Sequence, residues 1–330
     1  MSQKTTIPST KRITILRRIV QISAFLFINY VIIEIIFSIN LISFEGLIKI
    51  LPVLNSPRNP LSDGAGIVEY IFYFIAEGEF PFLLFGILIL IILFSGRFFC
   101  GWICPIGTIQ DALSAIPTKE RKIRDTESHL ISHRNLLNLK FLIIIAIAIV
   151  IFPLGITKTT DLVFYFQYKR NIGQMAQKPL GYFSLSEFIF NSFPDFIKNS
   201  WERKRLDLPE LTNPFEDFSG FLDFSIALFY IIFYIIVIIL AIFYPRFYCR
   251  YLCPFAGVAA AISDYSFLKL SRNPVRCVGR AKCGICERVC PKQIKILDEP
   301  FEFFTGKGEC NLCLKCKEKC PYYAIELKFG

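Results

Sequence analysis

Four long apolar stretches limit the folds open to this chain of 330 residues. They cover residues 19–44, 80–96, 141–157 and 224–245. An α-helix needs about 17 residues or more to cross roughly 30 Å of hydrocarbon, and each stretch is long enough. The composition agrees, because 54% of the residues are hydrophobic and only 19% are charged. An α-helical membrane protein with four transmembrane helices is therefore predicted, and a simple soluble enzyme is excluded.

Basic side chains are unevenly distributed over the segments between these stretches. Residues 1–18, 97–140 and 246–330 together carry 27 basic and 12 acidic side chains. Residues 45–79 and 158–223 carry 10 basic and 14 acidic ones. By the positive-inside rule, we expect a multi-pass protein of the inner membrane with both termini in the cytoplasm. This distribution accounts for the net charge of +10, and no nucleic-acid partner is expected.

The C-terminal region carries eight of the 12 cysteines, in two runs that each end in Cys-Pro. The first run is Cys277, Cys283, Cys286 and Cys290, and the second is Cys310, Cys313, Cys316 and Cys320. The second run has the C-x2-C-x2-C-x3-C-P spacing of bacterial two-cluster ferredoxins, whereas the first has a longer gap after its first member. Cytoplasmic thiols stay reduced, so metal ligation is expected here and disulfides are not.

The last cysteine of each run is expected to ligate the cluster of the other run, because one short loop cannot surround a cubane. One predicted 4Fe–4S cluster is ligated by Cys277, Cys283, Cys286 and Cys320, and the other by Cys310, Cys313, Cys316 and Cys290. Two zinc sites with four thiolates each are the alternative. The doubled run with Cys-Pro at both ends favours iron–sulfur. Residues 269–330 are thus predicted to form an α+β bacterial-type two-cluster ferredoxin domain.

The other four cysteines belong to an internal repeat. The motif RF[FY]C-x3-CP follows the second and the fourth apolar stretches, and it contains Cys100, Cys104, Cys249 and Cys253. The repeat predicts that residues 19–268 form two helix pairs, with an outer loop over residues 158–223 and a basic N-terminus over residues 1–18. Three roles are open for the four thiols: ligands of a third iron–sulfur cluster, thiol–disulfide redox pairs, or small buried residues that dock the ferredoxin domain.

Together these motifs resemble the NapH/NosR-type membrane-bound 4Fe–4S polyferredoxins, over nearly the whole chain from about Lys11 to Gly330. The compact layout is most similar to NapH. The resemblance implies electron transfer between the quinol pool and iron–sulfur centres, with quinone or quinol as substrate. It also implies membrane lipid and a redox protein as partners, so the chain is expected to be an electron-transfer subunit of a quinol-linked oxidoreductase.

Two further expectations concern the reaction. Glu34 is the only ionisable residue inside a predicted span, which makes it a candidate quinol-site residue that accepts protons near the outer face. A carboxylate that reaches the headgroup layer is the alternative interpretation. The alternative function is a redox-sensing or metalloenzyme-assembly protein, whose clusters report the redox state or supply electrons for cofactor maturation.

Overall fold

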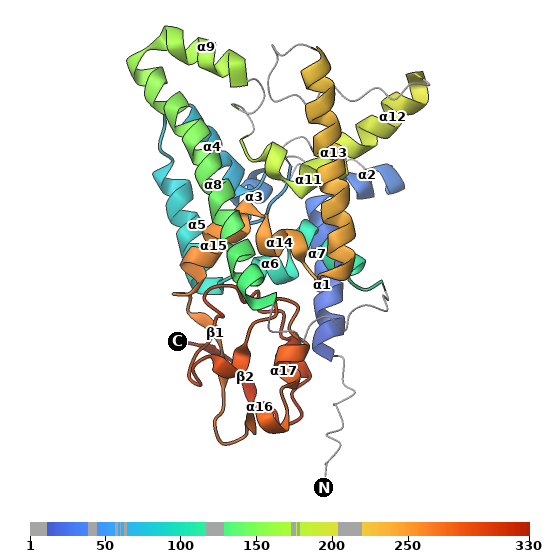
Figure 1. Cartoon of the computed structure of the whole chain (residues 1–330), viewed down its shortest axis with the longest axis vertical. Coiled ribbons are helices and arrows are strands. Elements are labelled where there is room, and N and C mark those ends of the chain that lie inside the picture. The colour runs from blue at the N-terminus through green and yellow to red at the C-terminus, as the bar shows by residue number, and fades with distance from the viewer. Residues whose placement is uncertain are drawn as a thin grey trace.

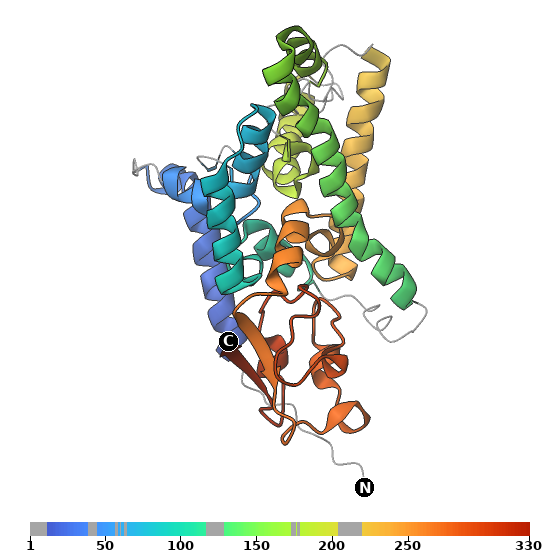
Figure 2. The same ribbon diagram turned by 90° about the vertical axis from the view of Figure 1, so that its left-hand side faces the viewer.

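The computed structural model is mostly helical, with a small two-stranded sheet near its C-terminal end. It describes residues 12–38, 45–56, 59, 61–62, 65–116, 129–172, 176, 179–203 and 220–330. Figure 1 shows a long helical body with the sheet and several short helices below it. The four longest helical elements run along the long axis in both views (Figures 1 and 2). They are α1 (Arg12–Ile28), α5 (Phe82–Ser95), α8 (His129–Thr160) and α13 (Gly220–Phe243).

The prediction of four transmembrane helices is not confirmed. Among the described residues, one segment, Leu136–Thr160 of α8, is by itself long and apolar enough to cross a membrane. The first predicted span is broken: α1 and α2 (Val31–Phe37) meet at an angle of 82° and pass the same test only as a pair. Helix α5 has 14 residues, and the apolar segment Leu228–Phe243 of α13 is also shorter than a full span.

Polar side chains explain the break in the first predicted span. The Asn29 amide donates a hydrogen bond to the Phe25 carbonyl oxygen (2.9 Å), and it accepts one from the Asn59 side chain (2.8 Å). Asn29 and Asn59 are buried, and Asn59 also donates to Asn55. A polar network of this kind satisfies the backbone groups that a bend releases. Apolar length alone does not reveal it.

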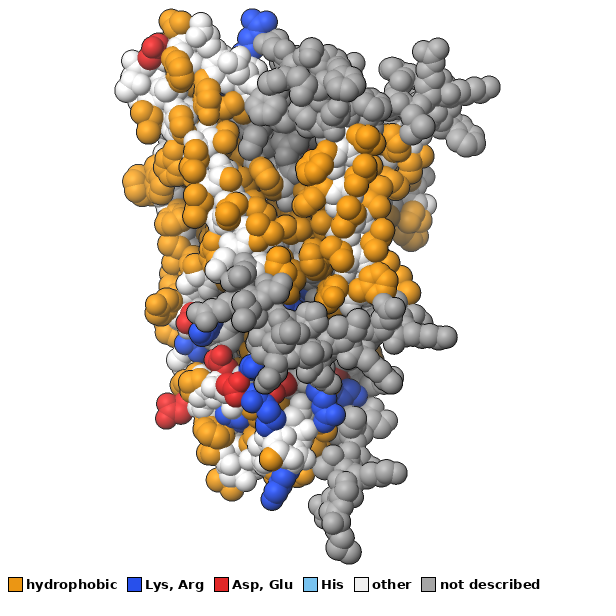
Figure 3. All heavy atoms as spheres, viewed as in Figure 1, with side chains coloured by type: hydrophobic (Ala, Val, Ile, Leu, Met, Phe, Trp, Pro, Cys, Tyr) orange, Lys and Arg blue, Asp and Glu red, His pale blue; other side chains and the backbone are white. Residues whose placement is uncertain are grey.

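The long helices expose many large apolar side chains. In Figure 3, hydrophobic side chains cover the face formed by α8 and α13, whereas Lys, Arg, Asp and Glu gather in the lower part of the molecule. Ile149 of α8, Phe229 of α13 and Leu83 of α5 are all more exposed than buried. Exposed apolar surface of this extent favours association with a membrane.

Shorter helices pack among the long helices, on the side of the repeat that faces away from the sheet (Figure 1), and Phe183 of η2 accepts a hydrogen bond from the Tyr248 hydroxyl. They are α3 (Glu45–Ile50), α4 (Ile67–Ala76), α9 (Leu162–Ile172), η2 (Gly181–Phe183), α11 (Leu185–Glu187), the π-helical η3 (Phe188–Ser192) and α12 (Phe193–Arg203). Glu77, which follows α4, joins this region to α8 and α9 through Lys158 (2.7 Å) and Lys169 (2.8 Å). Hydrogen bonds from the two lysines lower the pKa of Glu77 to about 2.

The two copies of the repeat lie between the long helices and the C-terminal domain (Figures 1 and 2). Each copy forms a short helix, a tight turn and a second helix. The first copy contains α6 (Phe98–Trp102) and α7 (Pro105–Leu113), and the second contains α14 (Phe247–Tyr251) and α15 (Pro254–Ser263). Proline occupies the first position of α7 and of α15, where its missing N–H costs no intrahelical hydrogen bond.

The C-terminal domain is built around an antiparallel pair of strands and a 30-residue repeat. Its elements are β1 (Leu268–Arg272), α16 (Gly279–Lys282), α17 (Ile285–Arg288), η5 (Ile296–Asp298), α18 (Lys315–Glu318) and β2 (Ile325–Phe329). Leu270 of β1 pairs with Leu327 of β2 and also forms a bridge with Phe304. A small core of Leu270, Ile296, Phe304, Leu312 and Ile325 holds this domain together.

Candidate functional site

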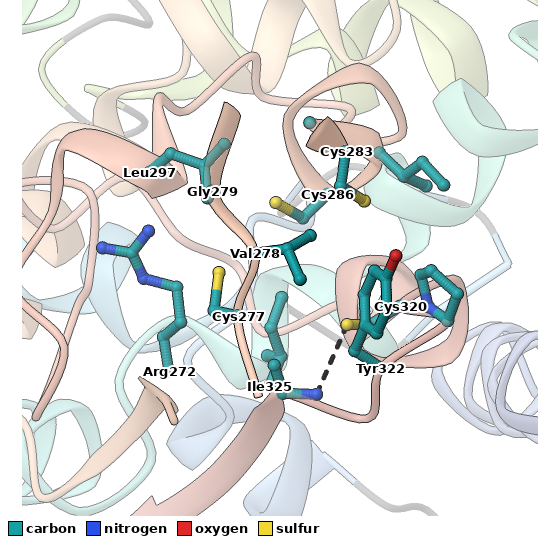
Figure 4. Close-up of a pocket in the computed structure, with 14 residues that line it drawn as sticks. Arg272, Cys277, Val278, Gly279, Cys283, Cys286, Leu297, Cys320, Tyr322 and Ile325 are labelled. Atoms are coloured by element: carbon teal, nitrogen blue, oxygen red, sulfur yellow. Dashed lines mark hydrogen bonds between the residues drawn. The ribbon is translucent and has the colours of Figure 1, made fainter. Parts of the chain in front are cut away.

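Two cavities in the C-terminal domain are each lined by four cysteines. The distal cavity, farther from the repeat, is lined by Cys277, Cys283, Cys286 and Cys320. The proximal cavity is lined by Cys290, Cys310, Cys313 and Cys316. Figure 4 shows the four cysteines of the distal cavity, with Tyr322 and Ile325 completing its wall. Each cavity thus takes three cysteines from one run and one from the other, which is the grouping that the ferredoxin spacing predicts.

The backbone of each cysteine run turns in the same way. Gly284 (φ +68°) precedes α17, and Leu314 (φ +56°), 30 residues later, precedes α18. Gln293 (φ +54°) and Tyr323 (φ +50°) form a second pair at the same spacing. Left-handed conformations at matched positions curl both loops alike, so that the first three cysteines of each run face one cavity and the last faces the other. The internal repeat seen in the sequence is therefore also a repeat of backbone geometry.

Buried apolar surroundings keep several of these thiols protonated when no metal is bound. Burial raises the pKa of Cys286 and of Cys310 to about 12. A metal ligand must be a thiolate, so binding of a metal centre at either cavity displaces protons. The Ala324 N–H points to the Cys320 sulfur (3.4 Å, dashed in Figure 4), a contact that stabilises negative charge on sulfur. Among the described residues, no three His, Cys, Asp or Glu side chains converge as ligands of a single metal ion do.

The four cysteines of the repeat form a third group, here called the thiol quartet: Cys100, Cys104, Cys249 and Cys253. All four are buried, with exposed fractions between 5% and 8%. Cys104 precedes α7 and Cys253 precedes α15, with nearly equal backbone angles (φ −61°, ψ 125° and φ −67°, ψ 117°). Electrostatic interactions connect the quartet in all six pairwise combinations, so the fold brings the two copies of the motif together.

Polar contacts to sulfur are present in the quartet as well. The Gln110 amide donates a hydrogen bond to the Cys249 sulfur (3.0 Å), and the Ala256 N–H donates to the Cys253 sulfur (3.4 Å). Burial, together with the neighbouring cysteines, raises the pKa of Cys104 to about 12. Cys104 is therefore protonated unless a metal or oxidation removes its proton.

The first copy of the repeat lies directly against the proximal cavity. A Cβ atom at Gly101, between Cys100 and Cys104, would lie 2.2 Å from the carbonyl oxygen of Asn311, which lines that cavity. The Trp102 indole N–H donates to the carbonyl oxygen of Leu312 (2.9 Å). The thiol quartet, the proximal cavity and the distal cavity are thus neighbours in that order, since Cys316 of the proximal cavity also interacts with Cys286 of the distal one.

Buried ion pairs connect the same parts, and sequence reasoning missed them. Arg246 binds Asp111 through two hydrogen bonds (2.9 and 2.7 Å), and Arg97 binds Glu309 (2.8 Å). Burial alone would raise the pKa of Asp111, but the guanidinium groups of Arg246 and Arg17 hold it well below its ordinary value. Arg97 and Arg246 begin the two copies of the RF[FY]C motif, and this recurrence is the signal that could have identified them.

Glu34, the candidate quinol-site residue, lies on α2 and is partly exposed. It stands beyond the bend that separates α2 from the part of α1 in contact with the repeat. Its neighbours Ile35 and Ile36 are mostly exposed. The bend therefore separates Glu34 from the part of α1 that contacts the first copy of the repeat.

Comparison with known proteins connects the repeat to iron–sulfur chemistry. Residues 78–124 and 226–273 match a family described as a 4Fe–4S binding domain. Each match contains one copy of the C-x3-C-P motif. The matches support iron–sulfur clusters as cofactors of this chain and are consistent with a polyferredoxin-type protein.

Two similar proteins come from the archaeon Methanocaldococcus jannaschii. The uncharacterized protein MJ0750 is 24% identical over 270 residues, which cover 80% of this chain and 85% of that protein. The uncharacterized protein MJ0749 is 32% identical over 72 residues, which cover 22% of this chain and 26% of that protein. No solved structure matches.

Proposed function

We propose that the protein is a membrane-bound iron–sulfur electron-transfer protein that connects the quinol pool with a redox partner. One observation carries the proposal. Two cavities, each with four cysteines, lie next to each other and next to a third group of buried thiols at the end of the long apolar helices. Redox centres that exchange electrons must be close together, and this arrangement brings three sets of thiols into one row.

The residues present fit 4Fe–4S clusters. Cys277, Cys283, Cys286 and Cys320 would hold one cluster, and Cys290, Cys310, Cys313 and Cys316 the other. When bound, each cluster supplies a centre that accepts and releases one electron. The walls of the proximal cavity are otherwise mostly apolar, with Leu270, Ile296 and Phe304 among them, and so exclude water. The protein's part is to supply thiolates, exclude solvent and donate N–H groups to sulfur.

The exposure of the cysteines suggests where a redox partner would approach. Cys277 and Cys283 of the distal cavity are partly exposed, whereas Cys290, Cys313 and Cys316 of the proximal cavity are buried. Exposed Arg276 and Lys282 flank the distal cysteines. A soluble redox protein can therefore come closest to the distal cavity, and membrane-bound quinol would react at the opposite end of the row.

The membrane and quinol parts of the proposal rest on the apolar surface and on the resemblance to NapH. The exposed apolar side chains of α5, α8 and α13 suit contact with lipid. The charge distribution favours an inner-membrane protein whose termini and residues 269–330 face the cytoplasm. Quinol oxidation releases protons as well as electrons, and Glu34, in the first turn of α2, is the proposed acceptor of protons.

Reduction of the clusters by quinol tests this function. Protein purified without oxygen in detergent is mixed with a reduced short-chain quinone, and cluster reduction is followed by electron paramagnetic resonance. The proposal predicts a signal from reduced clusters, and a Cys316→Ser variant should lose the part contributed by the proximal cavity. Intact clusters that dithionite reduces but quinol does not would contradict the proposal and favour a sensing or assembly role.

A further inference from the structure

Buried positive charge is in excess between the thiol quartet and the proximal cavity. Five cationic side chains are fully or almost fully buried there: Arg17, Arg97, Lys140, Arg246 and Lys292. Among the described residues, two buried carboxylates, Asp111 and Glu309, form ion pairs with these cations. Burying an uncompensated charge is costly, so such an excess calls for further negative charge close by.

Glu309 is shared by three of these cations. Arg97 lies 2.8 Å from its Oε2 atom, Lys140 contacts Oε1, and the Lys292 ammonium lies 3.6 Å from Oε2. Lys292 also donates a hydrogen bond to the carbonyl oxygen of Cys249 (3.3 Å). One carboxylate cannot balance three cations, and the surplus lies beside a member of the quartet.

Asp111 is shared in the same way. Arg246 binds both of its oxygens, and the Nη2 atom of Arg17 lies 3.5 Å from its Oδ2. Although it is fully buried, the Arg17 guanidinium donates no hydrogen bond to any described residue. Two nitrogens of Arg97, Nε and Nη2, likewise have no hydrogen-bond partner among the described residues. Buried guanidinium donors without acceptors need a partner that the described side chains do not supply, and an anion is one that also balances their charge.

Thiols are the groups that face this charge. Lys140 interacts electrostatically with Cys100 and Cys253, and Lys292 with Cys249. Arg246 interacts with Cys249 on one side and with Cys313 of the proximal cavity on the other. The cations therefore form a layer between two groups of four cysteines.

The quartet also receives favourable dipoles. Helices α7 and α15, of 9 and 10 residues, begin directly after Cys104 and Cys253, so their positive N-terminal ends point toward the sulfurs. The Ala256 N–H of α15 donates to Cys253. Both copies of the motif thus place a helix end where negative sulfur is stabilised.

We infer that Cys100, Cys104, Cys249 and Cys253 together ligate a third 4Fe–4S cluster, and that the buried cations around Asp111 and Glu309 balance its negative charge. The inference rests on the proposed function. Ligation replaces four thiol protons by iron, and a cubane with four thiolates is an anion in its usual oxidation states. Two disulfides, or four thiols that merely dock the ferredoxin domain, carry no charge and would supply no anion to the buried guanidinium groups of Arg17 and Arg97.

Iron and acid-labile sulfide counts on anaerobically purified protein test this inference without quinol. The expected result is about twelve irons per chain, and about eight in a Cys104→Ser/Cys253→Ser variant. Cys283→Ser serves as the control, since it should disturb the distal cavity and leave the quartet intact. About eight irons in the unaltered protein, with no loss in the double variant, would overturn the inference while the two-cluster function stands. Two disulfides found by alkylation and mass spectrometry would also overturn it.

A second variant keeps all the thiols in place. Lys140→Met removes a cation that faces Cys100 and Cys253, so the potential of the third cluster should become more negative while the iron content stays unchanged. Lys158→Met makes the same change on the same helix, at the end that contacts Glu77, and should leave every potential unchanged. Equal potentials in the Lys140→Met variant and the unaltered protein would contradict the proposed charge balance.

Discussion

The two copies of the RF[FY]C-x3-CP motif share their cysteine geometry but differ in what their arginines bind. Arg246, in the second copy, reaches Asp111 of the first copy and also donates to the carbonyl oxygens of Cys100 and Gly101. Arg97, in the first copy, binds Glu309 and the Gly308 carbonyl oxygen in the C-terminal domain. One arginine therefore joins the two copies to each other, and the other joins the pair to the C-terminal domain.

The residue after the first cysteine differs in a matching way. The first copy has Gly101, which lets the backbone approach Asn311 closely, and the second has Arg250, whose side chain donates to Gln293 (3.0 Å). Arg246 also has a left-handed backbone (φ +59°, ψ +37°), whereas in the first copy a positive φ falls on Gly96, one residue earlier, in a different conformation (φ +58°, ψ −133°). A repeated motif can thus keep one set of functional residues in place while its flanks diverge to build different contacts.

Removal of the Arg246 side chain should have the largest effect. Arg246→Met leaves Asp111 buried with Arg17 and Arg18 as its remaining ion-pair partners, and loss of one member of a buried pair costs about 3–5 kcal/mol. Arg97→Met should cost less, because Glu309 keeps Lys140 and Lys292. Thermal unfolding in detergent measures both. The distinction between the two arginines fails if Arg97→Met destabilises the protein as much as Arg246→Met.

Gly101→Ala should have the next largest effect, on the contact with the C-terminal domain. The added Cβ would lie 2.2 Å from the Asn311 carbonyl oxygen, so backbone must move, at a cost of about 1–3 kcal/mol. Gly86→Ala in α5 is the matched control, since a Cβ there meets nothing within 4 Å. Limited proteolysis should release the C-terminal domain faster from the first variant only. Equal cleavage rates would show that the close contact between Gly101 and Asn311 does not hold the domains together.

Trp102→Phe should have a smaller effect at the same interface. It removes the hydrogen bond to the Leu312 carbonyl oxygen and keeps an aromatic ring against Phe98, whose centroid lies 5.1 Å away. The expected loss is about 1 kcal/mol. Thermal unfolding should show a lower midpoint for Trp102→Phe than for the unaltered protein, and equal midpoints would contradict the assigned role of the indole N–H.

Cysteine spacing predicted more of the structure than apolar length did. The spacing grouped Cys320 with the first run and Cys290 with the second, and the same groups surround the two cavities, although their role as ligands stays a prediction. Cysteines that share a short loop are close in sequence, so their spacing can be read directly from the sequence. The four predicted spans were not confirmed. In the first of them, the buried polar residue Asn29 lies at a bend that the length of the apolar stretch does not reveal.

The buried charges could not be predicted from the sequence at all. Arg246 and Asp111 are 135 residues apart, and Arg97 and Glu309 are 212 apart, so no local pattern pairs them. Their position is determined by how the two copies pack on each other and on the C-terminal domain. Only the recurrence of arginine at the start of each copy hinted at a role.

The ion pairs of Glu77, between α4 and α5, provide the smallest predicted effect. Glu77 precedes α5 and pairs with Lys158 and Lys169, which lowers its pKa from 4.5 to about 2. Because the folded pKa lies below the unfolded one, the stabilisation is complete above about pH 4.5 and is lost as the pH falls toward 2. The groups are partly exposed, so we expect less than about 1 kcal/mol. The difference in unfolding free energy between the unaltered protein and a Glu77→Gln variant should shrink over this range. A difference that stays constant from pH 6 to about pH 2.5 would show that these ion pairs contribute nothing to stability.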